Sequence, residues 1–302
     1  MRALPRASIP AHLWSDQIMI LPTQLCAVYG ECLNSLGMYE EACGPSPPDS
    51  ELIGGSSDQD TINHFTHRFA ASAVRIEYLA LDPNESLGNI PSDLLITLCD
   101  GRIAVLDVPC GTGAGILSLL GTIAELRRSK VVSSLPLYVH VTAGDCSPKA
   151  LEIYEVILEE IQPWLVQQGI NVTWNKDLWH AERPESTSDL VTSWLSRNAN
   201  AEEYIVLIAA FSGEAATQFD AYKRTFEHIS ERLYGRRSSI VWVEPIWHKA
   251  ERLFKRVHDL FEKMPWFSED PTGALASRFL WLHPFNQKHI RGSILVKKYS
   301  RR

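Results

Sequence analysis

The chain has 302 residues, of which 45% are hydrophobic and 22% are charged, and it carries a net charge of −7 at pH 7. This length allows one elaborated domain or one domain with an appended helical piece, and the acidic balance argues against DNA or RNA held by bulk electrostatics. No apolar stretch is long enough to cross a bilayer, and the N-terminus lacks the apolar run of a signal peptide. We therefore expect a cytoplasmic protein that does not contact a membrane.

The first 100 residues predict a helical and irregular extension. Residues 1–43 are irregular to helical in character, and residues 44–60 are rich in Pro, Gly and Ser, as is typical of a linker. Residues 63–82 predict a helix that Pro83 ends, and residues 91–100 predict a second short helix. The apolar face of the longer helix consists of Phe65, Phe69, Ala73 and Ile76.

From residue 101 onward, predicted strands and helices alternate. This alternation predicts a parallel sheet covered by helices on both faces, and the last two strands are close enough to form a hairpin, which adds an antiparallel strand at the edge or within the sheet. We therefore divide the chain into an extension, residues 1–100, and one domain, residues 101–302. The predicted strands are 103–108, 137–145, 170–177, 203–211, 238–245, 277–285 and 291–299, and the predicted helices begin at Ala114 and cover 147–165, 215–233 and 249–264.

The motif LDVPCGTGAG, residues 106–115, lies between the first of these strands and a helix with Ile116, Leu119, Leu120 and Ile123 on one stripe. Glycines in such a turn let the backbone approach a ligand and direct helix N–H groups at it. A dinucleotide fingerprint fits poorly, because Ile116 stands where it requires glycine and no acid lies near residue 131. A phosphate-binding P-loop fits worse, because no Gly-Lys-Ser/Thr follows the glycines.

Two motifs together resemble the class I S-adenosylmethionine (SAM)-dependent methyltransferases. Their first motif, often D-x-G-C-G-T-G, is similar to DVPCGTGAG at residues 107–115, with Pro109 where glycine is usual. Their second strand commonly ends in D-x-S-P-x-A-L, and residues 145–151 read DCSPKAL. The resemblance implies an α/β fold with a doubly wound, mostly parallel seven-stranded sheet that closes with an antiparallel hairpin, and it implies SAM as the cofactor.

The resemblance also implies roles for the residues of both motifs. Gly111 and Gly113 would let the backbone pass under the methionine part of SAM, and Gly115 would let the helix pack close to the sheet. Asp107 would hold the loop or meet the ammonium of SAM. Asp145 would accept hydrogen bonds from both ribose hydroxyls.

Further cofactor contacts are implied at the ends of the next strands. Asp177 would meet the adenine amino group, with Leu178 against the ring. Ala210 and Phe211 would flank the methyl-transfer centre. Two neighbours of the motif acids complete the expected cofactor site: Pro109 and Cys146.

The sequence gives weaker indications of the methyl acceptor. No cysteine follows Cys146, which argues against cytosine C5 methylation, and residues 209–215 read AAFSGEA where adenine amino-methyltransferases have Asp/Asn/Ser-Pro-Pro-Tyr/Phe/Trp. No cluster has metal-ligand spacing, so we expect no metal. Glu244 and His248, at the end of the fifth predicted strand, are candidates to orient or deprotonate the acceptor.

The leading hypothesis is therefore a SAM-dependent methyltransferase that acts on a small molecule, a protein or RNA. The alternative is a catalytically inactive binding or scaffold protein that keeps the fold, which Pro109 and the plain AAFSGEA stretch would support. A nicotinamide-dependent oxidoreductase is a third class, against which the glycine spacing argues.

Overall fold

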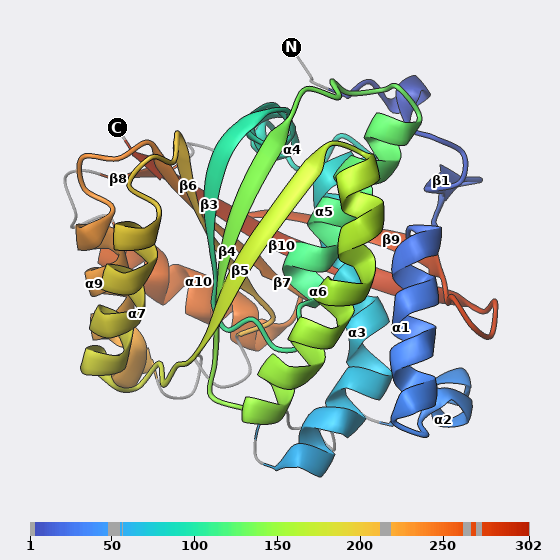
Figure 1. Cartoon of the computed structure of the whole chain (residues 1–302), viewed down its shortest axis with the longest axis horizontal. Helices are drawn as coiled ribbons and strands as arrows, with labels where there is room; N and C mark the ends of the chain where they lie inside the picture. The colour runs from blue at the N-terminus through green and yellow to red at the C-terminus, as the bar shows by residue number, and fades with distance from the viewer. Residues whose placement is uncertain are drawn as a thin grey trace.

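The computed structural model describes residues 4–47, 55, 57–211, 219–261, 267–269 and 274–301. Figure 1 shows one twisted sheet with helices on both faces. In this described part of the chain, no helix is both long and apolar enough to cross a bilayer. Parts of three predicted segments lie outside the described residues: 48–54 and 56 of the linker, 212–218 after the fourth predicted strand, and 262–264 of the last predicted helix.

The sheet has ten strands among the described residues, in the order β1-β2-β9-β10-β7-β6-β3-β4-β5, with β8 paired to β10 outside this path. The expected number of seven was wrong, because β1, β2 and β8 have only two or three residues each and show no alternation of polar and apolar residues. The strands are β1 (Trp14–Ser15), β2 (Ile18–Met19), β3 (Gly101–Asp107), β4 (Leu137–Asp145), β5 (Ile170–Leu178), β6 (Glu203–Ala209), β7 (Ser238–Glu244), β8 (Phe267–Glu269), β9 (Leu275–Leu282) and β10 (His289–Arg301).

The pairing directions agree with the predicted mixed sheet. Strands β5, β4, β3, β6 and β7 are parallel neighbours. The closing hairpin is confirmed, because β10 is antiparallel to both β9 and β7 and lies between them. Strand β2 adds to β9 in parallel and carries the sheet beyond the seven expected strands. This arrangement agrees with the mostly parallel α/β sheet and closing antiparallel hairpin that the sequence predicted.

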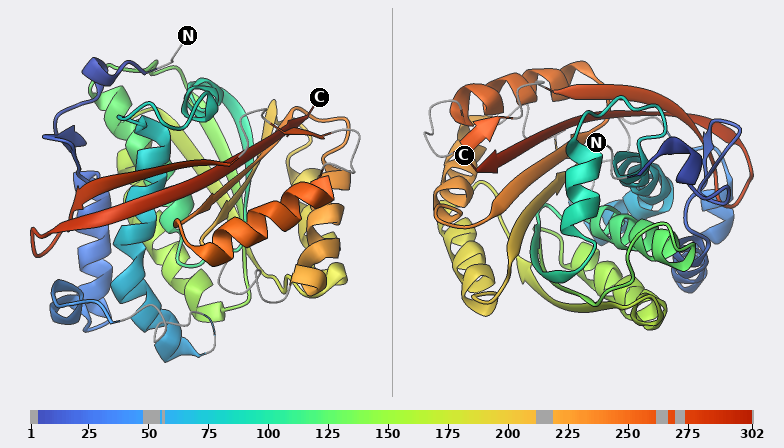
Figure 2. Two further views of the ribbon diagram at one scale, coloured as in Figure 1. Left: turned by 180° about the vertical axis from the view of Figure 1, so that it is seen from behind. Right: turned by 90° about the horizontal axis from the view of Figure 1, so that it is seen from above.

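Helices cover both faces, as the alternation predicted, and Figure 2 shows the two layers from above. On one face, α1, α3, α5 and α6 pack in a single apolar core, and on the other α7, α9 and α10 form a second core. The helices are α1 (Thr23–Ser35), α2 (Tyr39–Cys43), α3 (Asp58–Leu81), α4 (Ile90–Thr97), α5 (Ala114–Arg128), α6 (Pro148–Gln167), α7 (Pro184–Arg197), α9 (Phe219–Arg232) and α10 (His248–Phe261).

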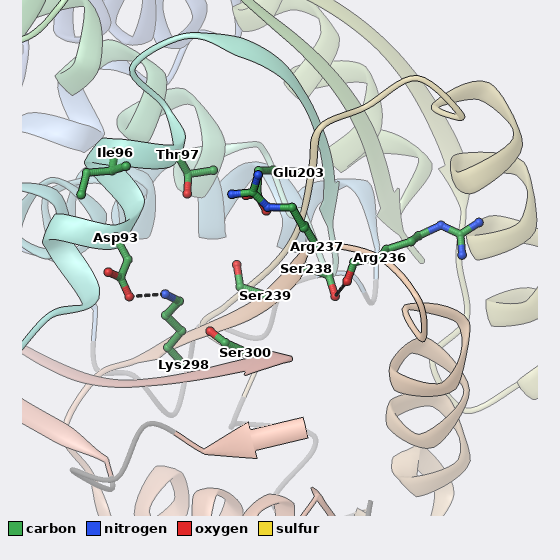
Figure 3. A pocket seen from close by; sticks show the side chains of 10 residues that line it. All are labelled: Asp93, Ile96, Thr97, Glu203, Arg236, Arg237, Ser238, Ser239, Lys298 and Ser300. Atoms are coloured by element: carbon green, nitrogen blue, oxygen red, sulfur yellow. Dashed lines mark hydrogen bonds and ion pairs between the residues drawn. The ribbon is translucent and has the colours of Figure 1, made fainter. Parts of the chain in front are cut away.

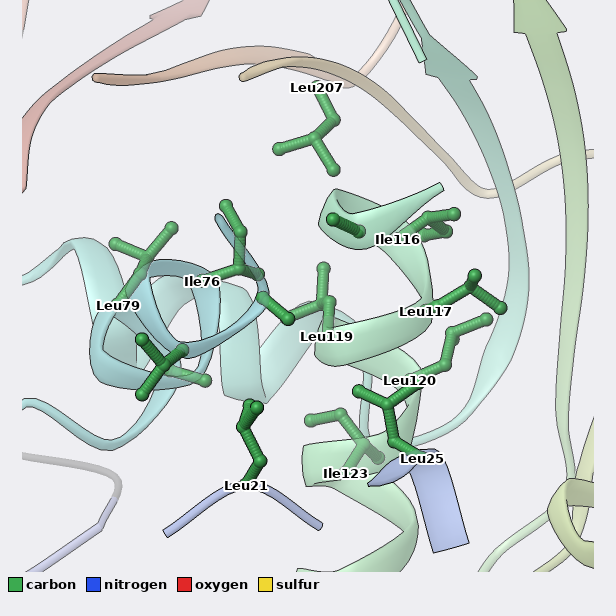
Figure 4. Packing of buried hydrophobic residues seen from close by; sticks show 14 of the residues in the cluster. Leu21, Leu25, Ile76, Leu79, Ile116, Leu117, Leu119, Leu120, Ile123 and Leu207 are labelled. Atoms are coloured by element: carbon green, nitrogen blue, oxygen red, sulfur yellow. The ribbon is translucent and has the colours of Figure 1, made fainter. Parts of the chain in front are cut away.

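Helix α5, which follows the glycine motif, is buried from Ala114 to Arg127. The sequence predicted one apolar stripe along it, but α1 and α3 cover the face that would otherwise meet solvent. Figure 4 shows Leu25 beside Ile123 and Ile76 near Leu119. The N-terminal helices therefore share the core of the sheet domain and hold α5 in place.

Candidate functional site

The strand order makes the carboxyl end of β3 a topological switch point, the position at which open α/β sheets have their ligand crevice. The chain runs from β3 to β4 and β5 on one side and then crosses back to place β6 on the other side of β3, so the strand order reverses its direction there. Ligands of open α/β sheets bind outside the carboxyl ends of the strands at such a switch point. The glycine motif follows β3 directly, which places it at this crevice.

The glycines of the motif have different tasks. Gly111 and Gly113 have φ angles of +51° and +86°, which favour glycine because a side chain strains this conformation. A Cβ atom on Gly111 would meet nothing within 4 Å, whereas one on Gly113 would lie 2.8 Å from both Tyr154 and Leu117. Gly111 therefore offers open backbone to a ligand, and Gly113 is needed for packing.

Gly115 permits the close packing of α5 on the sheet that the resemblance implied. A Cβ atom there would lie 3.2 Å from the side chain of Leu207 on β6. Pro109, which precedes the glycines, follows Val108 through a cis peptide bond. It therefore belongs to the turn that leads from β3 to Gly111.

Asp145, the last residue of β4, is joined to the glycine loop. Its Oδ2 accepts a hydrogen bond from the Gly111 N–H at 2.9 Å, and its Oδ1 accepts one from the Ser147 N–H at 2.9 Å. The side chain is buried, and burial raises its pKa above the ordinary value. Because each carboxylate oxygen has two lone pairs, Asp145 can still accept hydrogen bonds from a ligand.

Asp107, the last residue of β3, is buried beneath the same loop with 1% of its surface exposed. Its Oδ2 has no hydrogen-bond partner among the described residues. Burial, and then the charge of Asp145, raise the pKa of Asp107 well above its ordinary value. Asp107 is therefore shielded from solvent directly before the loop, and its role toward a ligand stays a prediction.

The expected adenine contacts lie beside Asp145 because β4 and β5 are parallel and in register. Gly144 pairs with Asp177 and Asp145 pairs with Leu178. The Oδ2 of Asp177 accepts a hydrogen bond from Asn175 Nδ2 at 2.8 Å, and Leu178 is 57% exposed. The structure thus brings Asp145, Asp177 and Leu178 to one edge of the sheet.

The structure also shows a contact to this edge that the sequence analysis missed. The Thr61 hydroxyl, at the start of α3, is 2.9 Å from the Ser147 hydroxyl, which caps α6. Cys146, between Asp145 and Ser147, is exposed. No sequence signal marks Thr61, since the two hydroxyls are 86 positions apart in the chain.

On the other side of the crevice, Ala210 and Phe211 follow β6. Ala210 is exposed and has a φ of +55°, a left-handed conformation that is rare for a residue with a side chain. The Phe211 N–H donates to Oε1 of Glu244 at 2.8 Å, and the Phe211 ring lies 6.3 Å from Trp179 and 5.3 Å from Tyr222 between centroids.

The two predicted catalytic residues lie in different environments. Glu244, at the end of β7, is completely buried, and its Oε1 also accepts a hydrogen bond from Trp242 Nε1 at 2.8 Å. His248 is exposed as the first residue of α10, and its ring centroid lies 6.2 Å from that of Trp247. Glu244 therefore holds backbone at the crevice, while His248 faces solvent.

The possible metal ligands among the described residues are dispersed. Across the residues that the structure describes, no three His, Cys, Asp or Glu side chains are grouped so that they could hold an ion.

Comparisons with known proteins find only distant similarity. No protein-family model and no curated protein matches the sequence. Loganic acid methyltransferase with SAH has 10% identity and a TM-score of 0.39, over 83% of this chain and 98% of that one. A protein of Streptococcus mutans assigned as a methyltransferase, in complex with SAH, has 15% identity and a TM-score of 0.33, over 70% and 94%. A structure from echinomycin biosynthesis, where a disulfide bond is converted into a thioacetal group, has 14% identity and a TM-score of 0.36, over 68% and 78%. These likenesses are too distant to identify a ligand for this chain.

Proposed function

We propose that this chain is a SAM-dependent methyltransferase that acts on a small molecule, a protein or an RNA. One observation carries the proposal: the carboxylate of Asp145, at the end of β4, is hydrogen-bonded to Gly111 in the open left-handed turn after β3. This bond joins the two motifs that carry the sequence resemblance, at the switch point where an α/β sheet binds its ligand.

The residues at the crevice fit SAM. Gly111 leaves its backbone uncovered, because a side chain there would meet no neighbour within 4 Å. Asp145 keeps acceptor capacity for the two ribose hydroxyls. Asp177 and Leu178 lie beside it and offer a carboxylate and an exposed apolar side chain to the adenine. Asp107 is too deeply buried to reach a ligand from its position, so we assign it to the support of the loop.

When bound, SAM supplies a methyl group on a sulfonium, which is transferred by in-line displacement. The protein's contribution to such a step is to position the reactants and to exclude water. Phe211, which is half-buried after β6 and packs against the buried ring of Trp179, would form an aromatic wall on the β6 side of the crevice. Glu244 fixes the backbone of Phe211, and in this proposal it positions that wall.

Calorimetric titration with SAM and with S-adenosylhomocysteine tests the proposal. We expect wild-type protein to bind both, and Asp145→Ala to bind them at least about tenfold more weakly, since it removes a charge-assisted acceptor at the ribose. The matched control is Asp189→Ala, which removes a carboxylate from α7 and should leave the affinity unchanged. Thermal unfolding of each variant is measured to establish that the variant is folded.

The outcomes separate the two hypotheses. A folded wild-type protein that binds neither compound contradicts the proposal and favours the catalytically inactive scaffold. Binding that Asp145→Ala leaves intact places the cofactor elsewhere. Binding with the expected loss in Asp145→Ala leaves only the acceptor to identify, and acceptor affinity that falls steeply with salt would indicate RNA.

A further inference from the structure

A cavity of about 480 Å3 lies at the opposite end of the sheet from the crevice, at the amino ends of β6 and β7 (Figure 3). This volume is within the usual range for small-molecule sites. Helix α4 forms one wall and the last residues of β10 form another. Because the proposed SAM site is at the carboxyl ends of the strands, this cavity is a separate feature of the molecule.

Three cationic residues line the cavity: Lys298 of β10, and Arg236 and Arg237 directly before β7. Lys298, on β10, is paired with Asp93 of α4 and only 12% of its side chain is exposed. The Arg237 guanidinium, next to β7, is 2.6 Å from Glu203 at the start of β6. An ammonium has three donors and a guanidinium has five, so each cation can bind an anion without leaving its carboxylate.

Hydroxyl groups fill the space between these ion pairs. Ser239 and Ser300 are directly opposite each other in the β7–β10 register, and Figure 3 shows them facing Thr97 across the cavity. Thr97 and Ser239 are half-buried, and both line the cavity. Hydroxyls can both donate and accept, which suits a ligand that carries hydroxyls of its own.

We propose that this cavity binds a small phosphorylated sugar. Lys298 and Arg237 would hold the phosphate as charge-assisted donors. Ser239, Ser300 and Thr97 would exchange hydrogen bonds with the sugar hydroxyls. Ile96, which is 65% exposed at the cavity, offers an apolar surface to the carbon face of the ring. This inference does not depend on the proposed methyl transfer.

The test is calorimetric titration of the full chain with ribose 5-phosphate, ribose and inorganic phosphate. We expect ribose 5-phosphate to bind with a Kd of about 1 mM or tighter, and ribose alone to show no binding. Lys298→Met and Arg237→Met should each weaken binding of ribose 5-phosphate about tenfold or more. The control Arg183→Met removes an exposed arginine that precedes α7 and is not among the residues that line the cavity. It should have no effect on binding.

A second pair of substitutions tests the proposed hydrogen bonds to the sugar hydroxyls. Thr97→Val combined with Ser239→Ala should weaken ribose 5-phosphate severalfold and leave the weaker binding of inorganic phosphate unchanged. The proposal is overturned if ribose 5-phosphate does not bind, or if both cation variants bind it as wild type does. It is also overturned if phosphate and ribose 5-phosphate bind with equal affinity and the Thr97→Val, Ser239→Ala double variant changes neither affinity. Because Arg237 is 80% exposed, Arg237→Met should remain folded even if Lys298→Met does not.

Discussion

The carboxylate of Glu244 accepts a hydrogen bond from the backbone N–H of Phe211 at 2.8 Å, and so joins the end of β7 to the residue that follows β6. The same oxygen accepts a hydrogen bond from the indole of Trp242. Because Glu244 is completely buried, this contact fixes the backbone where the chain leaves β6, beside the left-handed Ala210. Its catalytic role stays a prediction, whereas its positioning role has specific consequences.

Changing Glu244 should separate these roles. Glu244→Ala leaves two buried donors unpaired, and we expect the free energy of unfolding to fall by about 3 kcal/mol. Glu244→Gln keeps an acceptor oxygen and should cost about 1 kcal/mol or less. Urea unfolding measures both changes. A folded Glu244→Gln variant that binds SAM but no longer transfers methyl groups would instead indicate a general base.

The two glycines of the motif that have a left-handed backbone conformation, Gly111 and Gly113, should respond differently to substitution by alanine. Gly113→Ala combines backbone strain with contacts of 2.8 Å, so we expect a loss of about 2–4 kcal/mol in the free energy of unfolding. Gly111→Ala faces open space, so we expect only a strain of about 1–2 kcal/mol, together with a larger loss of SAM affinity. Thermal unfolding and calorimetry measure the two quantities. Equal losses of stability in both variants would contradict the assignment of Gly111 to the ligand side.

Glu77 of α3 is a second buried carboxyl with a predictable effect. It is fully buried, neither carboxyl oxygen has a hydrogen-bond partner among the described residues, and burial and then Glu125 raise its pKa well above 4.5. Above pH 4.5 the unfolded chain binds fewer protons at this group than the folded protein does. The free energy of unfolding therefore falls as the pH rises from about 4.5 toward the raised pKa.

Glu77→Leu should remove this penalty and raise the free energy of unfolding at about pH 7 by about 2 kcal/mol. Glu77→Gln should abolish the associated pH dependence without adding apolar contact. Urea unfolding at several pH values distinguishes the two. A less stable Glu77→Leu variant would show that the carboxyl has a binding partner in solution.

His64, also on α3, should produce a pH dependence of the opposite sign. Burial, and then the charge of Arg68, lower its pKa from 6.5 to about 4. Between these values the unfolded chain binds more protons, so the free energy of unfolding falls by at most about 1.4 kcal/mol for each pH unit as the pH drops. His64→Gln should flatten this slope between about pH 6.5 and about pH 5. Parallel stability curves for wild type and His64→Gln would contradict the prediction.

The central part of the fold could be predicted because its signals are local. The strand, glycine turn and buried helix around Gly111 follow each other directly, from Gly101 to Arg128. Ser147 and Pro148 start α6 where the motif DCSPKAL predicted it. The faces of α3 were also predicted correctly, since Phe65, Phe69, Ala73 and Ile76 are all buried.

Other features depend on contacts that no local pattern shows. Helix α7 was missed because its Glu-, Ser- and Thr-rich sequence buries only a narrow apolar side against α9. Strands β1 and β2 are too short for any periodicity. The complete burial of Glu244 follows from two surrounding layers, and the contact of Thr61 with Ser147 joins α3 to α6. A strand-end glutamate in sequence does not reveal which atoms surround it.

The pairing of β2 with β9 has a consequence for how the protein folds. Ile18 lies next to Leu280 in the sheet, so this edge closes only after nearly the whole described chain has been synthesised. Until then, β2 has no strand of the main sheet to pair with, and α3 lacks β10, one of the strands that it contacts. Contacts between such distant segments slow folding because the loop that joins them must first be ordered. We expect the ribosome-bound chain to depend on chaperones until β9 and β10 emerge, and to acquire its final protease resistance in one late step.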